Sequence, residues 1–318
     1  MLLQVFIFLV GLATLSWSAD RFVYGASALA KNIGMSPMMI GLTIVAMGSS
    51  APEIGVSALA SINGNINTAV GNALGSNITN IGLVLGVTAL IKPLLVSSTT
   101  LKRELPLLLG VTILAMFFVS GGHLSHFEGI VLFGLFIVVL AGVAWISLKV
   151  DKEDPIMAET ADEIPSGVSM GAAVSWIGVG LVLLLLSAHF MVQAAVSIAH
   201  YFGVSDLVIG LTVIALGTSL PELAASIAGV LKGEDDLALG NIIGSNIFNL
   251  LAVLGMPGLI APGILDADVY GRDIYIVFGM TLLLFIFSFN FFGKRHIGRT
   301  EGTILVLCFL LYQYWLFK

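Results

Sequence analysis

Two glutamates stand in nearly the same local sequence and could bind a cation together. Residues 48–53 read GSSAPE, and residues 217–222 read GTSLPE. Glu53 and Glu222 are therefore each preceded by two hydroxyl side chains and a proline. Carboxylate and hydroxyl oxygens are ligands for hard cations such as Na⁺, Ca²⁺ and Mg²⁺. A polar motif that occurs twice inside apolar sequence indicates an ion site built from both copies.

A second pair of motifs follows at the same distance. Residues 71–80 read GNALGSNITN and residues 240–249 read GNIIGSNIFN, again 169 positions apart (240 minus 71). Within each copy a serine and an asparagine lie four residues apart and share one helical face. Their glycines have the spacing that lets helices approach closely. The other asparagines point elsewhere, and we expect them to pack and to bond the backbone; they are Asn72, Asn77, Asn241 and Asn246.

The donor set of these motifs favours one class of ion. It comprises two carboxylates, several hydroxyls and amide oxygens, with no sulfur or imidazole, which argues against zinc and copper. An all-protein oxygen cage suits Ca²⁺ better than Mg²⁺, which sheds its water reluctantly. Two carboxylates balance one Ca²⁺, two Na⁺ or two protons, so the site could hold alternative loads with little net charge.

The glutamate motifs also predict a broken helix. Ala46, Ser49, Ser50 and Glu53 recur at the spacing of one helical face. Pro52 cannot donate a backbone hydrogen bond and clashes with the carbonyl four residues before it. We therefore expect a kink near residues 46–48 that frees carbonyl oxygens, and the same kink in the second copy. Freed carbonyls at membrane depth are tolerated where they line a cavity.

Composition places these motifs in a membrane. Hydrophobic residues make up 58% of the chain and charged residues 10%, whereas a soluble domain carries about 25% charged residues. The single cysteine, Cys308, excludes a disulfide framework, and the net charge of −6 is not typical of nucleic-acid binding. Apolar segments of spanning length are expected at residues 1–19, 36–62, 66–91, 104–121, 124–148, 168–189, 205–231, 235–260, 273–292 and 301–317.

These segments predict an all-α polytopic membrane protein with ten transmembrane helices arranged as two five-helix repeats. The first repeat covers residues 1–149 with its motifs at 41–80, residues 150–167 form a polar cytoplasmic linker, and the second covers 168–318 with its motifs at 210–249. An odd number of helices per repeat inverts the second copy. Eleven Lys and Arg residues fall on one side and only Arg272 and Lys318 on the other, which places both termini outside the cytoplasm.

At these motifs the chain resembles the cation/calcium exchanger superfamily, and most of all its prokaryotic calcium/sodium antiporters. The resemblance covers both repeats and implies exchange of Na⁺ for Ca²⁺ at one central cluster. It implies the following ligands: carboxylates of Glu53 and Glu222, hydroxyls of Ser49, Ser50, Thr218 and Ser219, carbonyls of Ala46 and Ala215, and the side chains of Ser76, Ser245, Asn80 and Asn249. Some members carry Asp where this chain has Asn249, so the site here has one negative charge fewer.

The expected function is a secondary antiporter that exchanges Na⁺ for Ca²⁺ across the plasma (inner) membrane by alternating access. A Ca²⁺/H⁺ antiporter using the same carboxylates is the alternative, and a cation channel is a third hypothesis. An enzyme is not expected, because the HExxH motif of metallohydrolases is missing from the sequence and no histidine is close in sequence to the repeated serines. We expect inorganic cations and the lipid bilayer as partners, with no cofactor, nucleic acid or obligatory protein partner.

Overall fold

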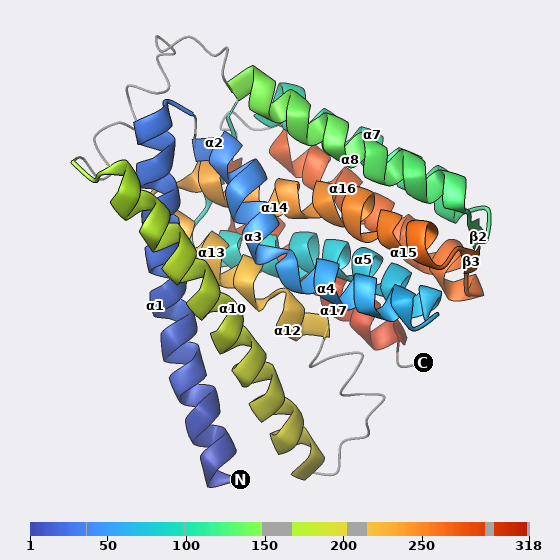
Figure 1. Cartoon of the computed structure of the whole chain (residues 1–318), viewed down its shortest axis with the longest axis horizontal. Helices are drawn as coiled ribbons and strands as arrows, with labels where there is room; N and C mark the ends of the chain where they lie inside the picture. Colours follow the sequence, from blue (N-terminus) through green and yellow to red (C-terminus); the bar gives the residue numbers. More distant parts are fainter. Residues whose placement is uncertain (36, 98–99, 148–166, 202–214, 290–295, 317–318) are drawn as a thin grey trace.

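The computed structural model describes residues 1–35, 37–97, 100–147, 167–201, 215–289 and 296–316 (Figure 1). The linker predicted at 150–167 and residues 210–214 of the second motif fall almost entirely outside these ranges. The first half contains α1 (Leu2–Ile33), α2 (Pro37–Ile40), η1 (Gly41–Val45), α3 (Ala46–Ser49), α4 (Ala51–Ile62), α5 (Ile66–Thr79), η2 (Asn80–Leu85), α6 (Gly86–Ile91), β1 (Leu94–Leu95), η3 (Thr100–Glu104), α7 (Leu105–Val119), β2 (His123–Leu124) and α8 (His126–Ser147), where η marks a π-helical turn.

The second half repeats much of this order. It contains α10 (Met170–Tyr201), α12 (Ala215–Thr218), α13 (Leu220–Leu231), α14 (Asp235–Phe248), η5 (Asn249–Val253), α15 (Gly255–Ile260), β3 (Gly263–Ile264), η6 (Val269–Asp273), α16 (Ile274–Ser288), β4 (His296–Ile297) and α17 (Arg299–Leu316). The predicted helical membrane protein is thereby confirmed in outline. Six described helices are long and apolar enough to cross a bilayer, or seven if the bent pair of residues 38–49 and 51–62 counts as one span.

Contacts between the halves are reciprocal. β1 pairs with β4 and β2 pairs with β3, so each of these two short sheets contains one strand from each half. Thr112 and Thr281, which are 169 positions apart, approach each other with their hydroxyl oxygens 3.4 Å apart. A residue that meets its own repeat counterpart lies near a two-fold axis. The duplicated sequence is therefore also duplicated in three-dimensional contacts.

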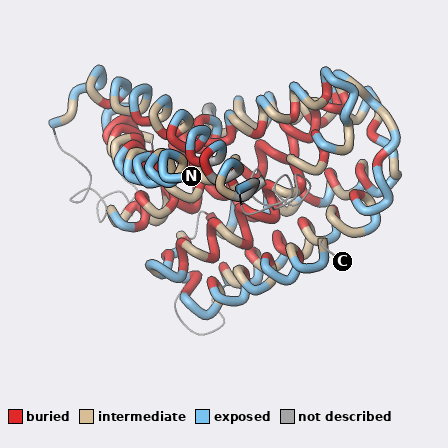
Figure 2. Tube along the Cα trace, turned by 90° about the horizontal axis from the view of Figure 1, so that it is seen from below, coloured by how far each residue is buried: buried red, intermediate tan, exposed pale blue. Residues whose placement is uncertain are grey.

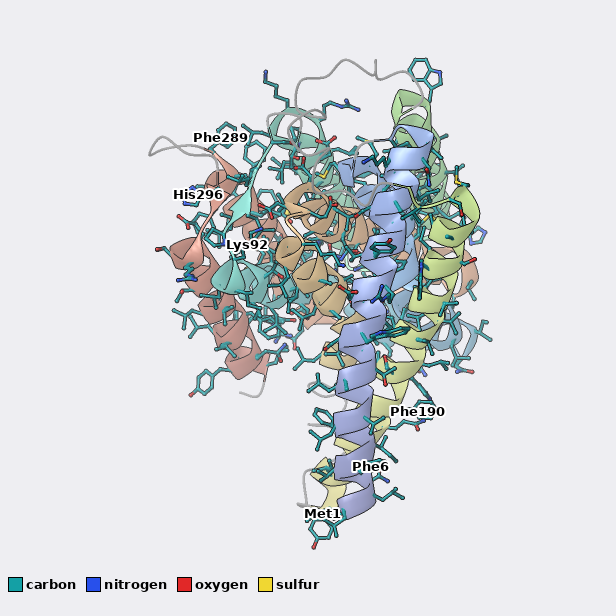
Figure 3. All side chains as sticks on the ribbon, turned by 90° about the vertical axis from the view of Figure 1, so that its left-hand side faces the viewer. Met1, Phe6, Lys92, Phe190, Phe289 and His296 are labelled. Atoms are coloured by element: carbon teal, nitrogen blue, oxygen red, sulfur yellow. The ribbon has the colours of Figure 1, made fainter. Side chains whose placement is uncertain are left out.

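Helices α1 and α10 form a pair of their own at one side of the bundle (Figure 1). They pack closely because glycines lie at the contact: a Cβ atom on Gly25 would come within 2.8 Å of the Ala173 carbonyl, and one on Gly180 within 2.7 Å of the Phe22 nitrogen. Their far ends project beyond the other helices and expose the apolar side chains Phe6 and Phe190 (Figure 3). Such exposure suits a surface that faces lipid rather than water.

The interior of the bundle is occupied by the helices that carry the second pair of motifs. Buried residues concentrate where helices cross, and exposed ones follow the outer faces (Figure 2). The most apolar window of the Asp235–Ile260 stretch, which contains α14, η5 and α15, is 100% buried. That of Ile66–Ile91, with α5, η2 and α6, is 72% buried. The serine and asparagine of each motif, Ser76 with Asn80 and Ser245 with Asn249, therefore lie inside protein rather than against lipid.

Candidate functional site

Both glutamates lie just after a break in a helix. The segments Met38–Ser49 and Ala51–Ile62 meet at an angle of 47°. Ser50 at the junction has φ −82° and ψ 9°, and Ser219 in the second half has φ −90° and ψ 5°. The break is thus at Ser50, beyond the predicted residues 46–48, and this part of the prediction was wrong. The reason is that a new helix starts at Ala51, which puts Pro52 in a first turn where no N–H is needed.

The restarted helices present the carboxylates to the centre of the protein. Glu53 lies in the first turn of α4 and Glu222 in the first turn of α13, and each has an exposed fraction of 0%. The first turn carries unpaired backbone N–H groups and partial positive charge, which favour a carboxylate. The two carboxylates belong to one cluster, because Ser50, three residues before Glu53, contacts Glu222 directly.

A hydrogen bond also joins the two halves at the glutamates. The Ser50 hydroxyl donates to Oε1 of Glu222 over 2.8 Å. Among the described residues, no lysine, arginine or histidine forms a salt bridge with either glutamate. Two buried carboxylates without a basic partner are costly unless a cation or a proton neutralises them.

Helices α5 and α14 supply the second pair of motifs. Each changes into a π-helical turn at its asparagine: η2 begins at Asn80 and η5 at Asn249. Such turns are rare and frequently occur at functional sites. Ser76 and Ser245 lie one helical turn earlier, and all four side chains are buried. The structure therefore buries the second motif pair in both halves, as the predicted ligand set requires.

Several of these buried groups have no hydrogen-bond partner among the described residues. Buried polar atoms in proteins are almost always paired, so a cluster of unpaired ones requires an explanation. Most of these unpaired atoms are oxygens, which are the ligands that Na⁺ and Ca²⁺ prefer. The unpaired side-chain atoms are Oε1 and Oε2 of Glu53, Oε2 of Glu222, Oγ of Ser219 and Ser245, and Oδ1 and Nδ2 of Asn80 and Asn249. A bound cation is chemically suited to satisfy the oxygens.

The remaining predicted ligands differ between the halves. The Ala46 carbonyl accepts the Ser50 N–H over 3.0 Å, so it is not fully freed by the break. Ser49 is buried beside it and donates either to that carbonyl or to Asn241. In the second half the Ser219 N–H bonds to the Leu216 carbonyl instead, over 3.2 Å. Ala215 begins α12, and the Thr218 side chain lies beside Glu53.

Two of the asparagines expected to bond the backbone do so at the glutamates, a target that the sequence did not specify. Asn72 donates through Nδ2 to the Glu53 carbonyl over 2.9 Å, and Asn241 donates to the Glu222 carbonyl over 3.3 Å. Asn72 and Asn241 occupy equivalent positions in the two repeats, and this equivalence was the sequence signal that could have predicted the two contacts. Asn77 and Asn246 behave as predicted and bond carbonyls of their own helices.

Glycines bring α14 against the first broken helix. A Cβ atom on Gly240 would come within 2.6 Å of the Met38 carbonyl, and one on Gly244 within 2.7 Å of the Leu42 carbonyl. The close approach predicted for these two glycines is therefore confirmed, whereas among the described residues a Cβ atom on Gly71 or Gly75 would meet nothing within 4 Å. It brings the α14 residues Asn241 and Ser245 toward the helix that carries Ser49 and Ser50.

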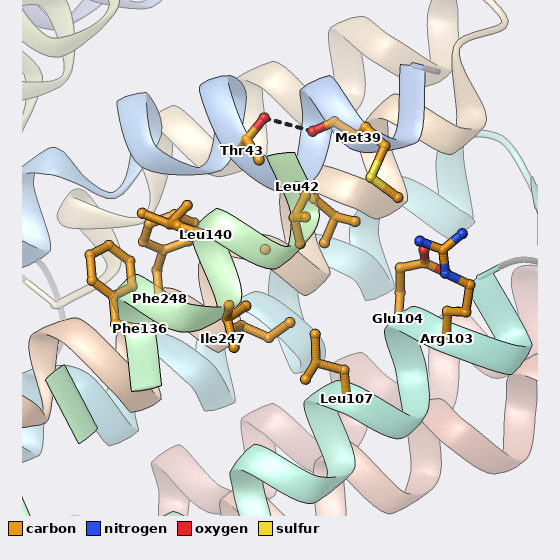
Figure 4. Close-up of a pocket in the computed structure, with 13 residues that line it drawn as sticks. Met39, Leu42, Thr43, Arg103, Glu104, Leu107, Phe136, Leu140, Ile247 and Phe248 are labelled. Atoms are coloured by element: carbon orange, nitrogen blue, oxygen red, sulfur yellow. Dashed lines mark hydrogen bonds between the residues drawn. The ribbon is translucent and has the colours of Figure 1, made fainter. Parts of the chain in front are cut away.

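An apolar cavity of about 290 Å³ lies beside this contact (Figure 4). It is lined by η1, α7, α8 and α14, and Arg103 and Glu104 mark one end. Thr43, also in its wall, turns its hydroxyl to the Met39 carbonyl over 2.7 Å. None of the predicted ligands lines the cavity, so it is distinct from the cluster around the glutamates.

The comparisons with known proteins match this geometry. The model of the sodium/calcium exchanger protein family matches residues 3–145 and 172–318. "Putative antiporter CaxA" of Alkalimonas amylolytica is 55% identical over 100% of both chains. "Sodium/calcium exchanger MaX1" of Methanosarcina acetivorans is 30% identical over 98% of this chain and 97% of its own.

A solved structure gives the same result for the fold. The sodium-calcium exchanger NCX_Mj, soaked with Na⁺ and without Ca²⁺, superimposes with a TM-score of 0.84 at 32% identity, covering 98% of this chain and 97% of that one. The regions matched by the family model include both glutamate motifs and both asparagine motifs. This chain therefore belongs to the sodium/calcium exchanger family of membrane antiporters.

Proposed function

We propose that this protein exchanges Na⁺ for Ca²⁺ across the plasma membrane and binds both ions at the cluster around Glu53 and Glu222. The observation that carries the proposal is the group of buried, unpaired oxygens contributed by both halves. Two carboxylates can neutralise one Ca²⁺ or two Na⁺, so the cargo ions compete for the same charge. Competition at one site is the physical basis of coupled exchange.

Alternating access is the transport mechanism we propose. The two halves form an inverted pair, which their reciprocal strand pairing and the Thr112–Thr281 contact support. Helices α1 and α10 pack on each other as a unit and would slide against the broken helices to open the site to either side. Positively charged loops orient both termini away from the cytoplasm, as the sequence predicts.

Reconstituted flux tests the proposal. Purified protein is placed in liposomes loaded with Na⁺ and diluted into Na⁺-free buffer with radiolabelled Ca²⁺, and uptake is compared with uptake under imposed H⁺ or K⁺ gradients. We expect Ca²⁺ uptake that requires the Na⁺ gradient and is unchanged by the other two. Uptake driven by H⁺ without Na⁺ would instead identify a Ca²⁺/H⁺ antiporter, and uncoupled flux would identify a channel.

The orientation has its own test. Cys308 is first replaced by Ser, and single cysteines are introduced at Lys31 or at Gly271. An impermeant thiol reagent added outside intact cells should label the Gly271→Cys variant and spare Lys31→Cys. Equal labelling of both positions would contradict the proposed topology.

A further inference from the structure

Asn241 makes more contacts at the site than its repeat counterpart and joins three elements of the protein. Its side chain is completely buried on α14, one helical turn before Ser245. Nδ2 donates to the Glu222 carbonyl over 3.3 Å and to the Ser226 hydroxyl over 3.0 Å. Oδ1 accepts the Ser49 hydroxyl, from the other half of the chain, over 3.1 Å.

These contacts fix the orientation of the amide. Rotating it by half a turn would set Oδ1 against the Glu222 carbonyl oxygen, and two acceptors would then face each other without a proton between them. The Ser226 hydroxyl, which can donate or accept, accepts from Nδ2 in this orientation. Asn241 therefore presents an acceptor, Oδ1, to Ser49.

The Ser49 hydroxyl has a single proton and several acceptors around it. Asn241 Oδ1 lies 3.1 Å away and the Ala46 carbonyl 3.4 Å away, and the Glu222 carboxylate lies in the same cluster, where the neighbouring Ser50 contacts it. A hydroxyl oxygen can coordinate a cation only through a lone pair, so its proton must point away from the ion. If the proton pointed at Glu222, it would occupy the carboxylate that the cation needs.

We propose that Asn241 is a positioning residue of the cation site: its Oδ1 accepts the hydrogen bond of the Ser49 hydroxyl and so leaves the Ser49 lone pairs free for the bound ion. Ser50 provides the contrast, because its proton goes to Oε1 of Glu222 itself. The inference rests on the proposed function, since it requires Ser49 to be a cation ligand. It assigns to Asn241 a role beyond packing and beyond the ligand set predicted from the motifs.

The repeat counterpart shows that this is not a general feature of the motif. Asn72 also donates to its glutamate carbonyl. Ser57, which corresponds to Ser226, donates to the Val253 carbonyl over 2.8 Å and not to Asn72. The serine that contacts Asn241 in the second half therefore has a counterpart, Ser57, that bonds a backbone carbonyl in the first half.

A double-mutant cycle on Ca²⁺ affinity tests the proposal. Equilibrium binding of radiolabelled Ca²⁺ is measured on the full-length purified protein for Ser49→Ala, Asn241→Leu and the double variant. A neutral hydrogen bond is worth about 1 kcal/mol, so each single variant should weaken binding by roughly five- to tenfold. The double variant should bind no more weakly than either single one, because both remove the same oriented oxygen.

Ser50 gives a matched control cycle. Its hydroxyl donates to Glu222 rather than to Asn241, so the coupling between Ser50→Ala and Asn241→Leu should be smaller than that between Ser49→Ala and Asn241→Leu. If Asn241→Leu does not fold, Asn241→Ser keeps a polar group at the buried position but withdraws the acceptor from Ser49, and the same non-additivity is expected.

The possible failures are distinguishable. Additive effects of Ser49→Ala and Asn241→Leu, or an unchanged affinity in Ser49→Ala, would overturn the positioning role while leaving exchange at the glutamates intact. Wild-type protein that binds no Ca²⁺ at all would overturn the proposed function, and the positioning role with it.

Discussion

The two halves of the chain carry the same motif, yet they treat their glutamates differently. Glu222 accepts a hydrogen bond from Ser50, and its backbone is held by Asn241, which Ser226 also contacts. Glu53 has its carbonyl held by Asn72 and the Thr218 side chain beside its carboxylate, but no hydrogen bond as short as that from Ser50 to Glu222 reaches its carboxylate oxygens within the part of the chain that the structure describes. Equivalent residues thus give Glu222 a short hydrogen bond from Ser50 of the opposite half, whereas Thr218 lies beside Glu53 without so short a contact.

This difference shows how a duplicated sequence can form an asymmetric site. Residue types are shared because the halves are copies, but each hydrogen bond has one donor and one acceptor and need not be made twice. We expect a carboxylate that accepts a short hydrogen bond from the protein to hold a fixed position, and one without such a bond to adjust to ions of different charge. Substitutions at matched positions of the two halves should therefore have unequal effects, and the largest is expected at the glutamates.

Replacing either glutamate should abolish exchange, with different consequences for stability. We expect Glu53→Gln and Glu222→Gln each to lower Na⁺-driven Ca²⁺ uptake at least about 100-fold, equivalent to ~2.7 kcal/mol. Without cations, Glu53→Gln should raise the unfolding temperature more than Glu222→Gln, because it removes a buried charge that lacks a partner. Flux and thermal unfolding in ion-free buffer measure both; a greater stabilisation by Glu222→Gln would contradict the comparison.

The equivalent serines Ser50 and Ser219 should differ in their effect on the stability of the ion-free protein, although both affect Ca²⁺ binding. Ser50→Ala removes the donor to Glu222, and hydrogen bonds to charged groups are worth about 1.5–3 kcal/mol, so the ion-free protein should be destabilised by that amount. Ser219→Ala removes a hydroxyl with no described partner and should change ion-free stability by less than about 0.5 kcal/mol. Both should weaken Ca²⁺ binding. Equal destabilisation by the two variants would remove the asymmetry between the halves.

The smallest effect concerns an ion pair made on one side only. Lys232, at the end of α13, contacts Asp20 of α1 over 2.7 Å, whereas the counterparts of these residues are Asn63 and His189. Asp20→Asn should lower stability by no more than about 1 kcal/mol, since both side chains are partly exposed. Asn63→Ala serves as the matched control and should have no effect in the same thermal unfolding assay. A loss of several kcal/mol in Asp20→Asn would show that the pair is structurally central.

Much of the site was predictable from one sequence. The burial of both glutamates, the close approach at Gly240 and Gly244, and membership of the exchanger family follow from repeated polar motifs in apolar segments, and they are confirmed. The ten spans, the inverted arrangement and the ligand set stay predictions. These depend on the membrane and the ions, which determine orientation and coordination.

Other features could not be read from the sequence for physical reasons. The break lies at Ser50 and not at residues 46–48, because a proline is accommodated in the first turn of a new helix. Several nearby residues could have started that helix, so the sequence did not identify the exact position. The contact between Ser49 and Asn241 joins residues 192 positions apart. Helical periodicity identifies which residues share a face, but it does not determine which face of the other half they meet. Because the motifs are alike, sequence alone could not show which glutamate would accept the short hydrogen bond from a serine of the other half.

The most direct test of a single shared cation site counts the Ca²⁺ ions bound. Equilibrium binding of radiolabelled Ca²⁺ to purified protein should show one class of site that Na⁺ displaces. Either Glu53→Gln or Glu222→Gln alone should eliminate it, because both halves contribute to one cluster. If each variant instead removed half of the binding and left the rest with unchanged affinity, the halves would hold independent sites, which would contradict a shared one.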